Sequence, residues 1–342
     1  MRTLVFLGLV SILCAPAACS QRSSTTPMPD AAPADDGGNN VEVACGALAR
    51  ASCTLRDTCT SGGNISRAYG DMAACLERET LACTLGATAP DTGRTTDTIE
   101  ACVAAYATLA CRDLFDNNLP AACEPLGRRP QNASCTFASQ CESGYCNNNK
   151  AATCGTCANP PAVGASCLDA NCDHGQVCDA RTNTCVSDEL AGAACDNNTQ
   201  PCGFALACVG NSTGVGTCTA ETSGLGDACN GTAAGLCDAK ANLSCTGDSG
   251  ARTCQVATFA GDGEPCGAQP TGNISCAAGG ACYDAAGMLA RAGEPGTCKA
   301  AAADGAACDL DHGPPCLAPG RCVVAGGGSA GTCTLPMAAT CP

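Results

Sequence analysis

The chain has 342 residues, of which 36 are cysteine, and its formal net charge at pH 7 is −15. It has no tryptophan, five phenylalanines and four tyrosines, which excludes a large core of aromatic side chains. The cysteine content predicts a small disulfide-rich fold in which cross-links replace such a core, and the acidic composition argues against binding to nucleic acid or anionic lipid.

Residues 1–18 have the pattern of a secretory signal peptide, in which one basic residue precedes an apolar run from Leu4 to Leu13. This run is too short to span a membrane. The ending Ala17-Ala18-Cys19 resembles a bacterial lipoprotein signal, although Pro16 stands where such signals usually have leucine. The resemblance implies that Cys19 is acylated and becomes the N-terminus. Ordinary cleavage near Ala17, which would release a soluble secreted protein, is the alternative.

The cysteine count agrees with this interpretation. If Cys14 leaves with the signal and Cys19 carries lipid, 34 cysteines remain, an even number as a fully paired framework requires. Residues 19–40 are rich in Ser, Thr, Pro, Asp and Gly and predict a disordered tether. By resemblance to bacterial sorting rules, Ser20 permits delivery to the outer membrane. We therefore expect secretion across the inner membrane and a lipid-anchored position at the outer membrane or cell surface.

Residues 41–127 have helical periodicity and predict an α-helical, disulfide-stapled domain. Cys45 and Cys53 are eight residues apart, as are Cys75 and Cys83, so each pair lies on one helix face. Two antiparallel helices with this spacing could be joined twice, and we take Cys45–Cys83 with Cys53–Cys75 as a hypothesis. The disulfide cysteines expected in this domain are Cys45, Cys53, Cys59, Cys75, Cys83, Cys102, Cys111 and Cys123.

The clearest helix lies in residues 96–111, TDTIEACVAAYATLAC, where Ile99, Cys102 and Tyr106 follow one another at helical spacing. Asp97 followed three residues later by Glu100 predicts an N-cap with a capping box.

Residues 128–342 predict six tandem four-cysteine modules with a truncated seventh. Each module has the order Gly-x-x-Cys, Cys, Cys, Thr-Cys, with Asn132 in place of glycine in module one. Gly and Asn accept positive φ most readily, so we expect a tight turn at the start of every module and a short strand before its last cysteine. The module cysteines are Cys135, Cys141, Cys146 and Cys157; Cys167, Cys172, Cys178 and Cys185; Cys195, Cys202, Cys208 and Cys218; Cys229, Cys237, Cys245 and Cys254; Cys266, Cys276, Cys282 and Cys298; Cys308, Cys316, Cys322 and Cys333.

A module of about 25 residues cannot bury enough area to fold alone, so two internal disulfides are expected to hold it. We favour pairing of the first cysteine with the third and the second with the fourth, which gives cysteine-knot-like modules arranged as a rod or curved stack. Two cysteines are left over. Cys341 is interpreted as closing the end of the array, and Cys154 as pairing within module one or toward the helical domain.

Module one, CTFASQCESGYCNNNKAATCGTC, resembles the N-terminal cysteine-rich region of Dickkopf proteins in its C-x5-C spacing, Tyr-Cys step and closing C-x-x-C. The resemblance covers residues 135–157, and the later modules follow it more loosely. Dickkopf proteins antagonise Wnt signalling in animals, an activity that a bacterial lipoprotein gives no reason to expect. The whole plan resembles the cysteine-rich secreted lipoproteins of myxobacteria, which implies a location and no activity.

Candidate chemistry is sparse. His174 and His312, the two histidines, both lie in Asp-His-Gly loops and are interpreted as turn residues, so we expect no enzymatic activity. Cys154-Gly155-Thr156-Cys157 could be redox-active or bind zinc, but it lacks a βαβ context and a second ligand pair, and we expect structural disulfides and no metal. The segment Asp309-Leu310-Asp311-His312-Gly313 resembles the start of a calcium loop, so calcium is kept as a weak alternative to no cofactor. Asn-x-Ser/Thr sequons, interpreted mainly as turns, lie at Asn64, Asn132, Asn197, Asn211, Asn230, Asn242 and Asn273.

These features predict a surface-anchored extracellular structural or binding protein stabilised by about 17 disulfides. Its partner is expected to be an extracellular protein or glycan of unknown identity, with membrane contact only through the N-terminal lipid. The alternative is a secreted inhibitor or ligand-like effector that acts through a module loop. The long loop between Cys282 and Cys298 is the candidate, since a variable loop on a rigid module suits inhibition.

Overall fold

The computed structural model describes residues 37–148, 153–167, 172–173, 175–179, 182–196, 201–210, 215–229, 235–248, 250–290, 294–326, 328–338 and 341. The predicted signal peptide, the lipidation residue Cys19 and nearly all of the predicted tether lie outside these residues. The fold is the small disulfide-rich one that the sequence predicts, with a helical region followed by short antiparallel strands.

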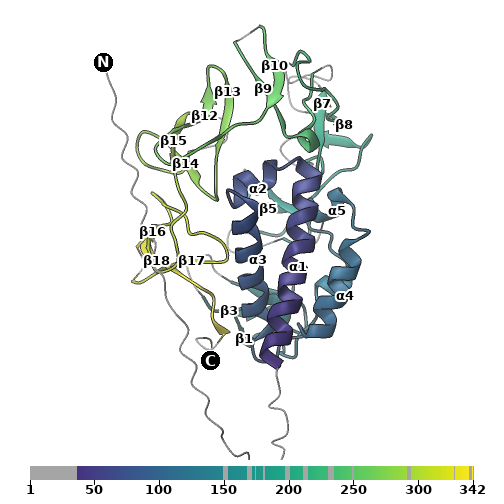
Figure 1. Cartoon of the computed structure of the whole chain (residues 1–342), viewed down its shortest axis with the longest axis vertical. Helices are drawn as coiled ribbons and strands as arrows, with labels where there is room; N and C mark the ends of the chain where they lie inside the picture. Colours follow the sequence, from purple (N-terminus) through teal and green to yellow (C-terminus); the bar gives the residue numbers. More distant parts are fainter. Residues whose placement is uncertain are drawn as a thin grey trace, which may run out of the picture. The chain divides into compact units, whose positions relative to one another are not determined.

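The helical region begins with a disulfide-stapled hairpin. Helices α1 (Gly37–Thr60) and α3 (Met72–Ala87) lie side by side, and the short α2 (Gly63–Ala68) connects them (Figure 1). The disulfides Cys45–Cys83 and Cys53–Cys75 join α1 to α3, as hypothesised from the eight-residue spacing. Helix α1 begins four residues earlier than predicted, because a helix held by packing continues its backbone hydrogen bonds into residues of poor propensity.

Helix α4 (Thr96–Tyr106) packs on the other side of α1, and α5 (Cys111–Phe115) and the 3-10 turn η1 (Ala121–Cys123) follow it. The predicted cap was wrong by two residues: Thr95, and not Asp97, caps α4. The Thr95 side chain accepts from the Thr98 backbone N–H, and the Thr98 side chain accepts from the Thr95 N–H. Asp97 instead lies in the first turn, where its charge favours the positive end of the helix dipole.

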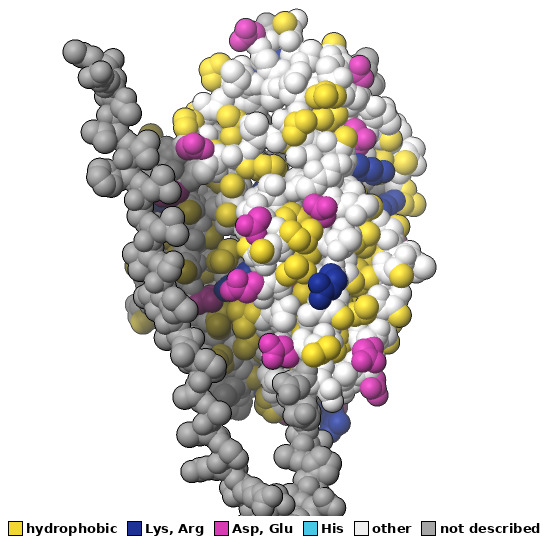
Figure 2. All heavy atoms as spheres, in the orientation of Figure 1, with side chains coloured by type: hydrophobic (Ala, Val, Ile, Leu, Met, Phe, Trp, Pro, Cys, Tyr) yellow, Lys and Arg dark blue, Asp and Glu magenta, His cyan; other side chains and the backbone are white. Residues whose placement is uncertain are grey.

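The helical core is small and contains sulfur. Ile99 packs with the Cys45–Cys83 pair, whereas Tyr106 and Leu114 pack with Cys102 and Cys123. Two further disulfides, Cys59–Cys111 and Cys102–Cys123, join α5 to α1 and η1 to α4. On the face that presents α1 and α3, charged side chains are scattered singly among hydrophobic and neutral ones (Figure 2).

Each module contains short antiparallel strands. In modules one, three and six the strand of the fourth cysteine lies between the strands of the first and third cysteines, and in module five β15 lies between β12 and β14 in the same way. In all six modules the third and fourth cysteines are register partners. The elements are β1 (Ser134–Cys135), η2 (Ala138–Gln140), β2 (Cys146–Asn147), β3 (Gly155–Cys157), β4 (Gln176–Asp179), β5 (Thr184–Ser187), β6 (Ala194–Asp196), β7 (Leu206–Gly210), β8 (Val215–Ala220), η3 (Ala239–Ala241), β9 (Leu243–Thr246), β10 (Thr253–Val256), β11 (Phe259–Ala260), β12 (Pro265–Gln269), β13 (Gly272–Cys276), β14 (Ala281–Tyr283), β15 (Gly296–Lys299), β16 (Ala307–Asp309), β17 (Arg321–Val324) and β18 (Ala330–Thr334).

The turn predicted at the start of every module is present. The glycine three residues before the first cysteine has φ between +76° and +84° in modules two to six, and Asn132 has φ +67° in module one. The N–H of this turn residue donates to the carbonyl of the fourth cysteine in every module, as from Gly305 to Cys333 at 2.7 Å. The positive φ of this residue directs its N–H toward the last strand. Gly and Asn adopt positive φ most readily, which explains why only they occupy this position.

A second repeated contact precedes each turn and was not predicted. The residue six positions before the first cysteine makes a parallel bridge to the second cysteine in five modules, as in Arg129 with Cys141 and Ala302 with Cys316. In these five modules the connecting segment thereby joins the edge of the module that follows it.

The predicted disulfide pairing is confirmed in all six modules: the first cysteine pairs with the third and the second with the fourth. Cys154 pairs with Cys341, which is 187 residues away. The expected partners of Cys154, within module one or in the helical domain, were therefore wrong. All 34 cysteines that follow Cys19 are paired in 17 disulfides.

The modules do not form the free-standing rod expected from the repeat, because several of them contact the helices. In module three, Phe204 stacks on Phe115 of the helical region with ring centroids 4.3 Å apart. In module five, the Ala278 N–H donates to the Ser66 carbonyl of α2 at 3.0 Å. In module six, Asp304 pairs with Arg78 of α3. Module six therefore contacts α3, and the Cys154–Cys341 disulfide joins the segment after module six to module one.

Candidate functional site

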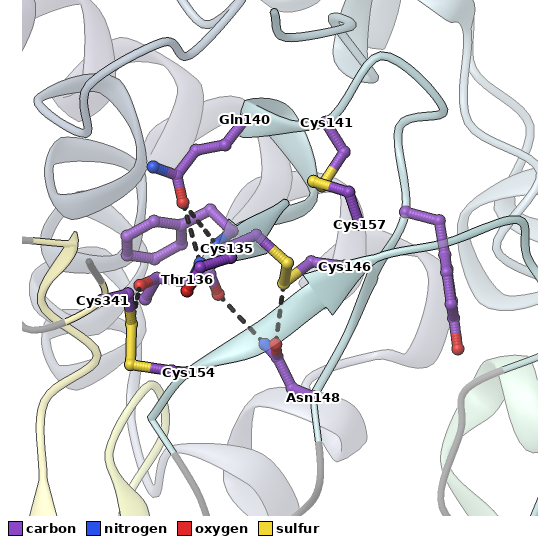
Figure 3. Close-up of a disulfide and its surroundings, with 12 residues drawn as sticks. Cys135, Thr136, Gln140, Cys141, Cys146, Asn148, Cys154, Cys157 and Cys341 are labelled. Atoms are coloured by element: carbon purple, nitrogen blue, oxygen red, sulfur yellow. Dashed lines mark hydrogen bonds between the residues drawn. A yellow bond between two sulfur atoms is a disulfide. The ribbon is translucent and has the colours of Figure 1, made fainter. Parts of the chain in front are cut away.

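The only C-x-x-C motif, Cys154 to Cys157, does not form a dithiol pair. Its two cysteines belong to different disulfides, since Cys157 pairs with Cys141 and Cys154 with Cys341 (Figure 3). Elsewhere in the described chain, groups of three cysteine sulfurs lie within 4.8 Å of one another because the two disulfides of a module are adjacent. These sulfurs are not thiolates, the form in which cysteine binds zinc or attacks a disulfide.

The Cys154–Cys341 disulfide lies against a buried polar network in module one (Figure 3). Thr136 is fully buried; its hydroxyl donates to the Cys341 sulfur at 2.9 Å, and its N–H donates to Gln140 Oε1 at 2.8 Å. Gln140 in turn donates to the Pro90 carbonyl at 2.9 Å, and Asn148 donates to the Thr136 carbonyl at 3.0 Å. The clasp formed by this disulfide therefore joins module one, the segment before α4 and the end of the chain.

A pocket of 490 Å³ lies where modules one, five and six meet, and we call it the three-module pocket. Module one contributes Asn148, which the Thr136 network holds, to one wall. The principal lining residues are Asn148, Tyr283, Leu289, Asp309, Leu310 and Arg321. The volume is typical of a small-molecule site, and the lining combines an apolar majority with a few polar groups, as such sites do.

The long loop of module five, the candidate of the sequence analysis, forms part of this pocket. Asp284 orders it, because its carboxylate accepts from the N–H groups of Ala286 and Met288, both at 2.9 Å. Leu289 then returns to the strand edge opposite Tyr283, and its N–H donates to the Asp311 carbonyl of module six. Met288 and Leu289 are nevertheless 43% and 58% exposed, so the loop presents apolar side chains from an ordered backbone.

Arg321, at the start of β17, is the most unusual group of the pocket. Its Nη1 atom is buried and has no hydrogen-bond partner among the described residues. Burial lowers the pKa of this guanidinium from its ordinary value. A buried charge without a partner is costly, and an anion that pairs with this guanidinium would offset that cost. No motif in the sequence marks Arg321, and only its position between modules distinguishes it.

Tyr283 forms the floor beside it and is buried. Burial, with a smaller effect of Asp309, raises the pKa of its hydroxyl, which stays protonated at neutral pH. The Lys299 ammonium lies 4.8 Å from the centre of this ring and donates to the His312 carbonyl. The Lys299 ammonium and the Tyr283 ring therefore form a cation–π contact.

The segment that resembles a calcium loop uses its first carboxylate for its own turn. Asp309 Oδ1 accepts from the N–H groups of Asp311 and His312, both at 2.9 Å. These bonds, with His312 first, lower the pKa of Asp309 to about 2. The same oxygen lies 3.5 Å from His312 Nδ1. This is the geometry of an Asx-turn, with which aspartate commonly starts a loop. It agrees with the interpretation of His312 as a turn residue.

The remaining predicted residues fall in two groups. His174 and the sequons at Asn197, Asn211 and Asn230 lie outside the described residues. Asn132 and Asn242 have positive φ and lie in turns, as interpreted from the sequence. For Asn64, which lies in α2, and Asn273, which lies in β13, the turn interpretation was wrong. Among the described residues, no helix combines the length and the hydropathy that crossing a membrane would require.

No protein-family model, curated protein or solved structure matches this chain.

Proposed function

We propose that this protein is a lipid-anchored extracellular binding protein whose ligand site is the three-module pocket. The disulfide content is that of a stable extracellular protein. The anchor at Cys19 and the ligand are the proposed parts. The observation that carries the binding function is the pocket itself, a mainly apolar recess built where three disulfide-rich modules meet and lined by one arginine whose Nη1 has no partner among the described residues.

The construction of the pocket supports this function. Each of the three contributing modules has two disulfides, and the Cys154–Cys341 clasp ties module one to the end of the chain. A site held this way has little conformational freedom to lose when a ligand binds, so less binding free energy is spent on ordering it.

Intact mass of the native protein, extracted from membranes and alkylated without reduction, tests the anchor and the disulfides together. We expect a chain that begins at Cys19, carries acyl mass, lacks the 34 thiol hydrogens and takes up no alkylating reagent. The Cys19→Ala variant should appear in the medium, whereas the matched Cys14→Ala variant should stay in the membrane. Acyl mass on the Cys19→Ala variant, or its absence from the parent protein, would refute the anchor.

A second candidate function, inhibition through the module-five loop, rests on Met288. This side chain is exposed at the ordered tip of the loop and does not line the pocket. An inhibitor that inserts this tip into a partner would lose activity in the Met288→Ser variant. A pocket-binding protein would keep its ligand in that variant and lose it when Leu310, inside the pocket, is replaced by serine.

A further inference from the structure

We infer that the three-module pocket recognises a small amphipathic carboxylate, a ligand in which one carboxylate is joined to an apolar body, with Arg321 as the partner of the carboxylate. This inference rests on the proposed function of the pocket and names its ligand class.

The charge of the ligand follows from Arg321. Arg321 lines the pocket, and its buried Nη1 has no partner among the described residues, whereas Arg78, a buried arginine that contacts module six, is bound to two carbonyls and a carboxylate. Arg321 thus differs from an arginine that the fold uses for its own stability. An incoming anion would provide the missing acceptor, and a guanidinium pairs best with a planar carboxylate or a phosphate.

The apolar walls select the carboxylate. Leu289, Leu310, Pro315 and the Tyr283 ring line the same space, and Arg321 is the one cationic side chain among the described lining residues. A phosphate dianion would need several donors to replace its hydration, whereas a carboxylate monoanion is balanced by one guanidinium. The apolar body of the ligand would then cover Leu289 and Leu310, which are 58% and 42% exposed.

Asp309 is the group whose charge opposes an anionic ligand. It is the acidic group of the pocket, but its Oδ1 already accepts from two backbone N–H groups of its own turn. Asp309 therefore has partners within the fold, and Arg321 has none for Nη1. The Lys299 ammonium, 4.8 Å from the centre of the Tyr283 ring, adds positive potential. The two cations, Arg321 and Lys299, outnumber the single Asp309 carboxylate, so the local charge favours an anion even though the whole chain is acidic.

The test is isothermal titration calorimetry of the mature, disulfide-intact protein with decanoate, and with decanol as the uncharged ligand of equal chain length. We expect one decanoate per protein and an affinity at least tenfold higher than that for decanol. Arg321→Met, which keeps the length of the side chain and removes the charge, should abolish this difference. The matched Arg252→Met variant, at an exposed position of module four, should leave it unchanged.

The outcomes separate this inference from the proposed function. If decanol and decanoate bind equally and Leu310→Ser weakens both, the pocket is a binding site but the role of Arg321 is refuted. If neither ligand binds at millimolar concentration, the ligand class is refuted, while the intact-mass and Met288 experiments still decide the function. Arg321→Met removes a group whose buried Nη1 has no partner among the described residues, so we expect it to fold, and its intact mass with all disulfides formed verifies this.

Discussion

Arg78 of α3 and Asp304 of module six, 226 residues apart in sequence, form a bidentate ion pair with N–O distances of 2.7 and 2.9 Å. The Arg78 side chain is 8% exposed and also donates to the carbonyls of Leu317 and Ala318. Module six is thus docked on the helical hairpin by one side chain that satisfies three acceptor groups.

Replacing Arg78 should destabilise the protein, because Arg78→Met leaves a carboxylate and two carbonyls without their donor. We expect a loss of about 3 kcal/mol in the free energy of unfolding. Guanidinium denaturation with disulfides intact measures this loss, and Arg50→Met, at an exposed position of α1, is the matched control.

Hydrogen bonding from Arg78 lowers the pKa of Asp304 below 3.8. The stabilisation is therefore present above pH 3.8 and should disappear as the pH falls through the folded-state pKa. A loss that does not depend on pH in this range would contradict the ion pair.

The clasp should hold module one against modules five and six. In Cys154→Ser/Cys341→Ser we expect a loss of about 2–5 kcal/mol in the free energy of unfolding, since this disulfide closes the longest loop. Amide hydrogen exchange should accelerate in residues 134–148, which carry the Thr136 network. The Cys172→Ser/Cys185→Ser variant, confined to module two, should leave exchange there unchanged. Equal exchange in both variants would show that the clasp does not order module one.

The turn at the start of each module allows the energetic cost of a positive φ to be measured without a change in side-chain packing. Gly305 has φ +81°, and a Cβ added there would meet no atom within 4 Å. We therefore expect Gly305→Ala to cost about 1 kcal/mol through its positive φ alone. Gly305→Asn should cost less, because Asn132 occupies the same position in module one with φ +67°. Gly328→Ala, where φ is not positive and space is also open, is the control. Equal denaturation midpoints for all three variants would refute the requirement for positive φ.

Asp188 should make stability fall as the pH rises. Burial, then the nearby Asp116, raises its pKa from 3.8 to about 6, and Arg112 partly opposes this. The folded state therefore holds the proton more tightly than the unfolded state, so the cost of ionisation is absent below pH 3.8 and develops up to about pH 6. Because the group is only partly buried, we discount the effect to about 1 kcal/mol. Asp188→Asn should be more stable than the parent at pH 7 and equal to it at pH 4, whereas the exposed Asp248→Asn control should show no such difference. An equal effect at both values of pH would contradict the shift.

Local features of this protein are determined by its sequence. The repeated spacing of cysteines, the Gly or Asn three residues before each first cysteine and the Thr before each last one predict the module, its turn and its pairing, because these depend on contacts between residues close in the chain. The helical hairpin was predictable for the same reason, since Cys45 and Cys53 share one helix face. The cap of α4 was less predictable, because Thr95 and Asp97 are both good capping residues and only the side-chain geometry chooses between them.

Only the tertiary structure decided how these parts meet. The Cys154–Cys341 pair, the Arg78–Asp304 ion pair and the stacking of Phe204 on Phe115 join residues from 89 to 226 positions apart. A repeat determines the structure within each unit, but not the direction in which successive units turn, because loops of different length connect them. The pocket at Arg321 exists only because those turns bring modules one, five and six together. The sequence thus determined the modules, and the long-range packing determined the site.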